Sequence, residues 1–64
     1  MFNASRLTLA RKRRPFTKKE LAEAARLTPN TLTRLEAGDT TEPSSDTVRS
    51  LARALNYPAE FFYL

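Results

Sequence analysis

Apolar residues along this chain recur at intervals of three and four, which is the spacing of one face of an α-helix. The pattern is clearest at Val48, Leu51, Ala52 and Leu55. No stretch of strand length alternates apolar and polar residues, so no β-sheet is predicted. We therefore expect an all-α fold, a compact domain of five helices.

The first helix is expected over residues 4 to about 14. Asn3 is a favourable N-cap, and Phe2 and Leu7 have the spacing of a hydrophobic staple around it. Pro15 ends the helix, because the residue before a proline is pushed out of the α region.

Residues 17–38 are expected to form two short helices joined by a tight turn. Thr17 and Glu20 have the spacing of a capping box, which opens the earlier helix. Thr28 is a suitable cap for the later one, and Gly38, the only glycine of the chain, lies where that helix needs a left-handed C-terminal residue. This two-helix unit is the centre of the predicted fold.

Ser44 caps a fourth helix that Asn56 ends, and a short fifth helix is expected from Pro58 to about Tyr63. The expected core consists of the inward-facing apolar residues Leu7, Ala10, Phe16, Leu21, Ala22, Leu27, Leu32, Leu35, Val48, Leu51, Leu55 and one or both of Phe61 and Phe62.

The composition restricts the chemistry of the chain. Its 64 residues correspond to a single domain, residues 1–64, and include no cysteine or histidine. Disulfides and ordinary His or Cys metal sites are excluded, and no cofactor is expected.

Ser44 and Ser45 have no neighbouring base and there is no glycine-rich phosphate loop, so we do not expect an enzyme. There is no membrane-length apolar run and no signal-peptide core, so a cytoplasmic protein without a membrane partner is expected.

Charge is distributed unevenly around a net value of +4. Residues 1–34 contain nine Lys or Arg and two acids, whereas residues 35–64 contain two Arg and five acids. A basic half suggests an anionic partner such as a phosphate backbone, although a solvated basic face would look the same.

Two basic groups are candidate phosphate contacts. One is the run of residues 11–14, from which Arg13 is taken as the contact, although such a run also suits the dipole of a helix C-terminus. The other is Lys18 and Lys19, at a helix N-terminus that favours anions; two solvated lysines are the alternative.

The later helix of the 17–38 unit has a polar stripe opposite its leucines. Asn30, Thr33, Arg34 and Ala37 follow at i, i+3, i+4 and i+7, and none is a large apolar residue. Arginine bonds a guanine edge at two points, and asparagine bonds an adenine edge at two points. The stripe therefore predicts that this helix is held out toward a nucleic acid.

Three segments together resemble the phage-repressor and Cro-type, or XRE, helix-turn-helix family. They are T-K-K-E-L-A, L-T-x-x-T-L-x-R-L-E-x-G and P-S-x-x-T-x-x-x-L-A-x-A-L, within a match from about Arg6 to Phe62. The resemblance implies a lambda-repressor-like fold and a transcription regulator that binds double-stranded DNA sequence-specifically, with repression favoured. It also implies that helix 28–37 reads the major groove, and that a homodimer binds an inverted-repeat operator.

The resemblance assigns roles to individual positions. Base contacts are expected from Pro29, Asn30, Thr33 and Arg34. Phosphate contacts are expected from Lys18, Thr28 and Thr31. Arg11 and Glu36 match positions that form a structural ion pair in many members, and a half-buried carboxylate would need such a partner.

Two departures from the family pattern stand out. Arg26 occupies a turn position that usually holds glycine, so either the turn differs or Arg26 accepts a left-handed conformation. The loop after residue 38 holds Asp39 and Glu42 where relatives often have Lys or Arg, which leaves Thr40 and Thr41 as its candidate phosphate contacts.

The ending F-F-Y-L leaves three interpretations open: a dimer interface, an end folded onto the domain's own core, or a fragment. The start and ending resemble domains found ahead of a zinc metallopeptidase-like domain, so a further C-terminal domain is possible.

The alternative function is a protein-interaction or antitoxin-like module, whose acidic half and aromatic end would face a partner such as a toxin.

Overall fold

A computed structural model describes residues 1–39 and 42–64. It contains α1 (Ala4–Arg13), α2 (Lys18–Ala24), α3 (Pro29–Ala37), α4 (Ser45–Leu55) and a 3₁₀ helix, η1 (Ala59–Tyr63). No strand occurs in these two ranges. The all-α prediction is confirmed. None of the helices seen there has the length and apolar character needed to cross a membrane.

The prediction of five helices is confirmed for the first four, and the fifth is a 3₁₀ helix instead of an α-helix. The last helix, η1, is only five residues long and follows Pro58, whose backbone is extended. The amide of Phe61 donates to the carbonyl of Pro58 at 3.0 Å, an i to i+3 bond that winds the chain more tightly than an α-helix. Residues 1–39 and 42–64 therefore contain four α-helices and a closing 3₁₀ helix.

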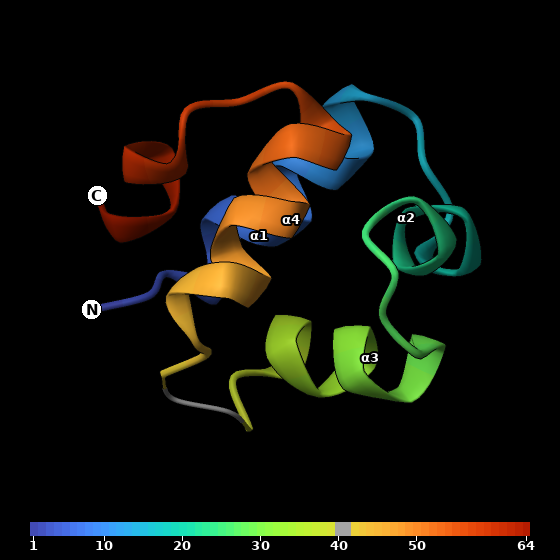
Figure 1. Ribbon diagram of the computed structural model, residues 1–64, viewed down its shortest axis with the longest axis horizontal. Coiled ribbons are helices and arrows are strands. Elements are labelled where there is room, and N and C mark those ends of the chain that lie inside the picture. Colours follow the sequence, from blue (N-terminus) through green and yellow to red (C-terminus); the bar gives the residue numbers. More distant parts are fainter. Residues whose placement is uncertain (40–41) are drawn as a thin grey trace.

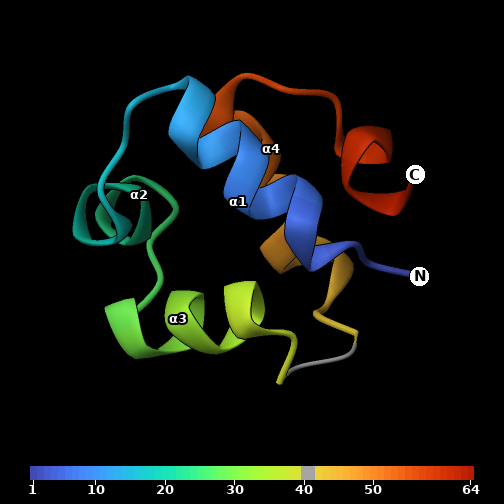
Figure 2. The ribbon, with the colours of Figure 1, turned by 180° about the vertical axis from the view of Figure 1, so that it is seen from behind.

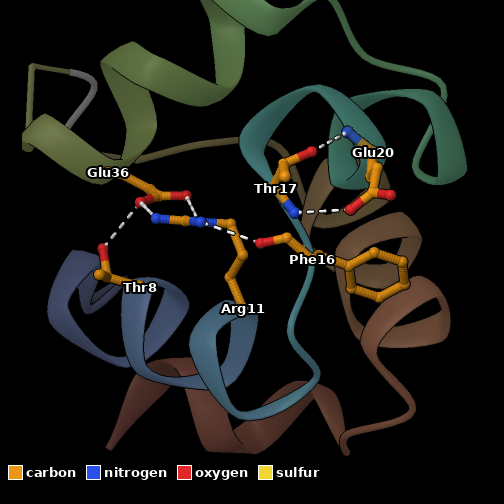
Figure 3. A network of polar contacts seen from close by, with 6 residues as sticks. All are labelled: Thr8, Arg11, Phe16, Thr17, Glu20 and Glu36. Carbon is orange, nitrogen blue, oxygen red and sulfur yellow. Dashed lines mark hydrogen bonds and ion pairs between the residues drawn. The ribbon is translucent and has the colours of Figure 1, made fainter.

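Side-chain caps begin the helices where the sequence indicated. Asn3 Oδ1 accepts from the amide of Ser5 at 3.0 Å. The amide of Glu20 donates to Thr17 Oγ1 at 3.1 Å, and the amide of Thr17 donates to Glu20 Oε1 at 2.9 Å, as Figure 3 shows. The predicted capping box is confirmed, and it satisfies two amides that the first turn of α2 leaves free.

The helices enclose the core from several directions. Figures 1 and 2 show α1 and α4 one behind the other in the middle of the view, with α3 lying along one edge. α3 packs against α2 and α1, while η1 packs against α1 and α4 at the end away from α2. Both ends of the chain lie on that side, where the amide of Asn3 donates to the carbonyl of Phe62 at 2.7 Å.

The core differs from the predicted one at its margins. The buried apolar residues are Phe2, Leu7, Ala10, Leu21, Ala22, Ala25, Leu32, Leu35, Val48, Leu51, Ala52, Leu55 and Phe62. Phe16, Leu27 and Phe61 are only partly buried and pack against its edge. Phe2 is buried because its ring stacks on that of Phe62, with centroids 6.3 Å apart.

Candidate nucleic-acid interface

The polar stripe of α3 lies on the surface of the molecule. Asn30, Thr33, Arg34 and Ala37 are all exposed, whereas both leucines of the helix are buried in the core. The predicted division of α3 into an inner and an outer face is therefore present. The outer face offers an amide, a hydroxyl and a guanidinium along one line, and no large apolar side chain interrupts it.

The start of α3 is held by its own side chains. Thr28 Oγ1 accepts from the amide of Thr31 at 3.2 Å, and the two hydroxyl oxygens are 2.8 Å apart. Pro29 occupies the first turn, where its missing N–H costs no hydrogen bond. Both hydroxyls are exposed, so they remain available to a phosphate beside the stripe.

Two lysines mark the start of α2. Lys18 and Lys19 are exposed, and neither forms a salt bridge in the part of the chain that the structure describes. α2 packs directly against α3. Free amides and the helix dipole at this terminus favour an anion, and the two ammonium groups add to that preference.

Arg26 adopts the left-handed conformation that the family usually assigns to glycine. Its φ is +60°, and its amide donates to the carbonyl of Glu23 at 3.2 Å. The next amide, that of Leu27, donates to the carbonyl of Ala22 at 2.7 Å. Of the two possibilities left open for this turn, the structure shows the second: the turn is kept and the arginine accepts its conformation.

An ion pair joins the far end of α3 to α1. Arg11 Nε donates to Glu36 Oε2 at 2.7 Å and Arg11 Nη2 donates to Glu36 Oε1 at 3.2 Å (Figure 3). The side chains are 13% and 6% exposed. Thr8 Oγ1 donates to Glu36 Oε1 at 3.0 Å, and Arg11 Nη1 donates to the carbonyl of Phe16 at 3.0 Å. The sequence indicated the pair but not the last two partners.

The basic run of residues 11–14 is divided by the fold. Arg11 points inward to its ion pair. Arg14 Nε donates to the carbonyl of Leu55 at 2.8 Å, and its guanidinium lies 4.7 Å from the ring centre of Tyr57. Both arginines form hydrogen bonds with other helices, Arg11 with α3 and Arg14 with the end of α4. The run therefore does not form one continuous phosphate-binding surface.

Arg13 lies apart from the other predicted DNA contacts. Two residues along an α-helix correspond to a rotation of about 200°, so Arg13 is on the opposite side of α1 from Arg11. It lines a hollow with Leu9 and Phe61, away from the side of α1 that faces α3. The predicted phosphate contacts Lys18, Lys19, Thr28 and Thr31 lie in α2, in α3 or at the cap of α3. Arg13 instead lies on the side of α1 that does not face α3.

The described residues on either side of positions 40 and 41 in the loop after α3 are acidic. The predicted contacts Thr40 and Thr41 lie outside the described residues. Asp39 is exposed, and its amide donates to the carbonyl of Arg34 at 3.0 Å. Glu42 accepts a hydrogen bond from the amide of Phe2 at 3.3 Å, so its carboxylate helps to hold the N-terminal segment.

Two of the comparisons with known proteins find a likeness. A family model for helix-turn-helix proteins matches residues 7–62. Among solved structures, the chain is similar to the clp gene regulator ClgR from C. glutamicum, with 33% sequence identity and a TM-score of 0.85. That likeness covers 94% of this chain and 77% of the other. No curated protein sequence matches.

Proposed function

This chain belongs to the XRE-type helix-turn-helix family of DNA-binding transcription regulators, and from that premise we propose that α3 is its recognition helix, inserted into the major groove of a specific operator. The observation that carries the proposal is the exposed polar stripe of α3, on a helix held at both ends. A rigid helix with bidentate side chains suits readout of base edges.

Within the stripe, Asn30 and Arg34 provide most of the proposed specificity. Arg34 would bond O6 and N7 of a guanine, and Asn30 would bond N6 and N7 of an adenine. Pro29 and Thr33 are the neighbouring surfaces for base edges, with the methyl group of Thr33 suited to a thymine methyl. Because the N-terminal part of a recognition helix meets the bases, Asn30 is placed for the deepest contact.

The backbone contacts in this proposal come from the starts of α2 and α3. Lys18 and Lys19 would neutralise phosphates, while the hydrogen-bonded hydroxyl pair of Thr28 and Thr31 would donate its one free proton to a phosphate oxygen. These contacts fix the register of the domain on the duplex without reading sequence. They also make affinity fall steeply as salt rises, because each neutralised phosphate releases counterions.

We further propose that the domain acts as a homodimer on an inverted repeat and represses transcription by occupying that site. One domain of this size presents a single short helix, which reads only a few base pairs. Two copies related by a two-fold axis would read two half-sites about one helical turn apart. Repression by occupancy requires no surface other than the DNA-binding one.

A binding selection tests the function directly. The 64-residue chain is incubated with a library of random DNA duplexes at about 0.1 M salt, and retained duplexes are amplified and sequenced. We expect enrichment of an inverted repeat with half-sites about one helical turn apart. A double variant, Asn30→Ala with Arg34→Ala, is the control and should retain bulk DNA without enriching any sequence. Failure of the unmodified chain to enrich any motif would contradict the proposal.

A further inference from the structure

Exposed apolar side chains gather on one side of the molecule, around α1 and η1. Leu9 is 41% exposed and Tyr63 is 39% exposed. Leu9 and Phe61 line a hollow of about 340 Å³, and Tyr63 lines a second hollow of about 400 Å³. The two hollows share Asn3 and Ser5 in their walls, so they form one continuous surface. Apolar surface gathered in this way marks an interaction site more often than single exposed residues do.

This surface, the α1–η1 face, is defined here by Arg6, Leu9, Arg13, Glu60, Phe61 and Tyr63. It does not overlap the stripe of α3. Leu9 and Arg13 are on the opposite side of α1 from Arg11, whose partner Glu36 belongs to α3. Figures 1 and 2 also place η1 away from α2. A partner bound to the α1–η1 face would therefore leave the proposed DNA contacts free.

Charges of both signs surround the apolar centre of the face. The guanidinium of Arg6 lies 4.8 Å from the ring centre of Phe61. Arg13 is exposed one helical turn beyond Leu9, and Glu60 is exposed on η1. In a 3₁₀ helix residues i and i+3 eclipse, so Glu60 shares its side with Tyr63. Neither Arg13 nor Glu60 forms a salt bridge within the described part of the chain.

A surface with an apolar centre and unpaired charges of opposite sign can complement itself. In a two-fold interface the same patch is used on both partners, so a cation on one copy must find an anion on the other. We propose that the α1–η1 face is the contact between two copies of this chain, with Leu9, Phe61 and Tyr63 packed across the axis and Glu60 of each copy paired with Arg13 of the other. The two-fold arrangement rests on the function proposed above.

The size of the face indicates a weak dimer. Stable protein interfaces bury about 1,200–2,000 Å² in total, which is more than a few side chains of a 64-residue domain provide. Association is therefore expected at high protein concentration in solution. A duplex with two half-sites would strengthen it, because the first bound copy raises the effective concentration of the second.

Sedimentation equilibrium on the free chain, up to millimolar concentration and without DNA, is the first test. We expect a monomer–dimer equilibrium whose dissociation constant rises at least about tenfold in Leu9→Glu. Ala24→Glu is the matched control, because Ala24 is exposed on α2 and outside the face. Circular dichroism checks that each variant is folded. A chain that stays monomeric throughout, or a dimer that Leu9→Glu leaves unchanged, overturns the proposal.

A charge exchange tests the pairing itself. Glu60→Lys and Arg13→Glu should each weaken the dimer, and the two together should restore it, since the attractive pairs are rebuilt with reversed signs. Glu23→Lys makes the same change at an exposed position of α2 and should have no effect. Additive weakening in the double variant would exclude this two-fold arrangement.

Binding to short duplexes separates this inference from the proposed function. Leu9→Glu should bind a single half-site as tightly as the unmodified chain but lose affinity for the inverted repeat. A chain that dimerises through this face and yet selects no DNA sequence would contradict the function alone. A chain that selects DNA but never dimerises would contradict the interface alone.

Discussion

Arg11 and Glu36 form a two-point ion pair that ties α1 to the last turn of the stripe-bearing helix, with nitrogen–oxygen distances of 2.7 and 3.2 Å. The same guanidinium donates to the carbonyl of Phe16 at 3.0 Å, so it also fixes the chain that leads into α2. One side chain is thereby bonded both to α3 and to the segment that leads into α2.

We expect Arg11→Ala to lower the free energy of unfolding by about 3 kcal/mol. The carboxylate of Glu36 is only 6% exposed and would keep Thr8 as its one remaining donor. Leaving a largely buried charge without its partner is costly, and the loss is a large fraction of the stability of a small domain. Urea and thermal unfolding measure the change.

Arg49→Ala provides the control for this loss. Arg49 pairs with Asp46 on α4, but both side chains are largely exposed. Exposed pairs of this kind contribute little, so a change within about 0.5 kcal/mol is expected. An unchanged melting temperature in Arg11→Ala would show that the ion pair does not stabilise the fold.

We expect Arg26→Gly to raise the free energy of unfolding by about 0.5–1 kcal/mol. The left-handed φ of +60° disfavours a residue with a Cβ, and glycine removes that cost while adding some entropy to the unfolded chain. The melting temperature should rise by several degrees. A lower melting temperature would mean that the arginine side chain stabilises the turn by more than its backbone costs.

Gly38→Ala is the opposite substitution at the end of α3. The φ of Gly38 is +82°, and a Cβ built there would meet no atom within 4 Å. Any loss therefore comes from the backbone conformation alone, and we expect about 1 kcal/mol. Thermal unfolding should show this loss as a lower melting temperature. An unchanged melting temperature would indicate that the backbone at the end of α3 adopts another conformation at no cost.

Much of the fold could be predicted because the ends of its helices depend on residues close together in the sequence. The capping box at Thr17 and the left-handed ends at Gly38 and Asn56 depend on a few neighbouring residues, and all three are present in the structure. The burial of Phe2 depends instead on Phe62, which lies at the other end of the chain. Helical spacing alone gives no indication of such a contact.

The candidate site likewise has one part that the sequence predicts and another that it does not. The outer stripe of α3 follows from helical periodicity and was predicted at each position. The division of the basic run could not be predicted, because Arg14 donates to the carbonyl of Leu55, which lies 41 residues further along the chain. The position of Arg13 relative to α3 likewise depends on which side of α1 the rest of the chain covers, and sequence spacing does not specify this.

Lys18 and Arg13 are expected to differ in their effect on DNA binding, although the sequence suggested the same role for both. Lys18→Ala should reduce the slope of log affinity against log salt by about one, because it removes one phosphate contact. Arg13→Ala should leave the slope unchanged, since it faces away from α3. Binding to a random duplex long enough for one domain, titrated at several salt concentrations, measures both. Equal slopes in the two variants would contradict this placement of the interface.

Arg34→Ala is expected to weaken binding to the selected operator by about 1–3 kcal/mol and to relax the sequence preference at one base pair. Binding to random DNA should fall only by the small amount that the loss of one positive charge explains. Arg34→Lys makes this distinction sharper, because lysine keeps the charge but lacks the planar fork that bonds a guanine at two points. It should bind random DNA as the unmodified chain does and still lose preference at the same base pair. Competition assays with the operator, its single-base variants and random duplexes give the three affinities. If both variants lost equally on operator and random DNA, Arg34 would be a phosphate contact, and the outer stripe of α3 would have to read sequence through Asn30 and its neighbours.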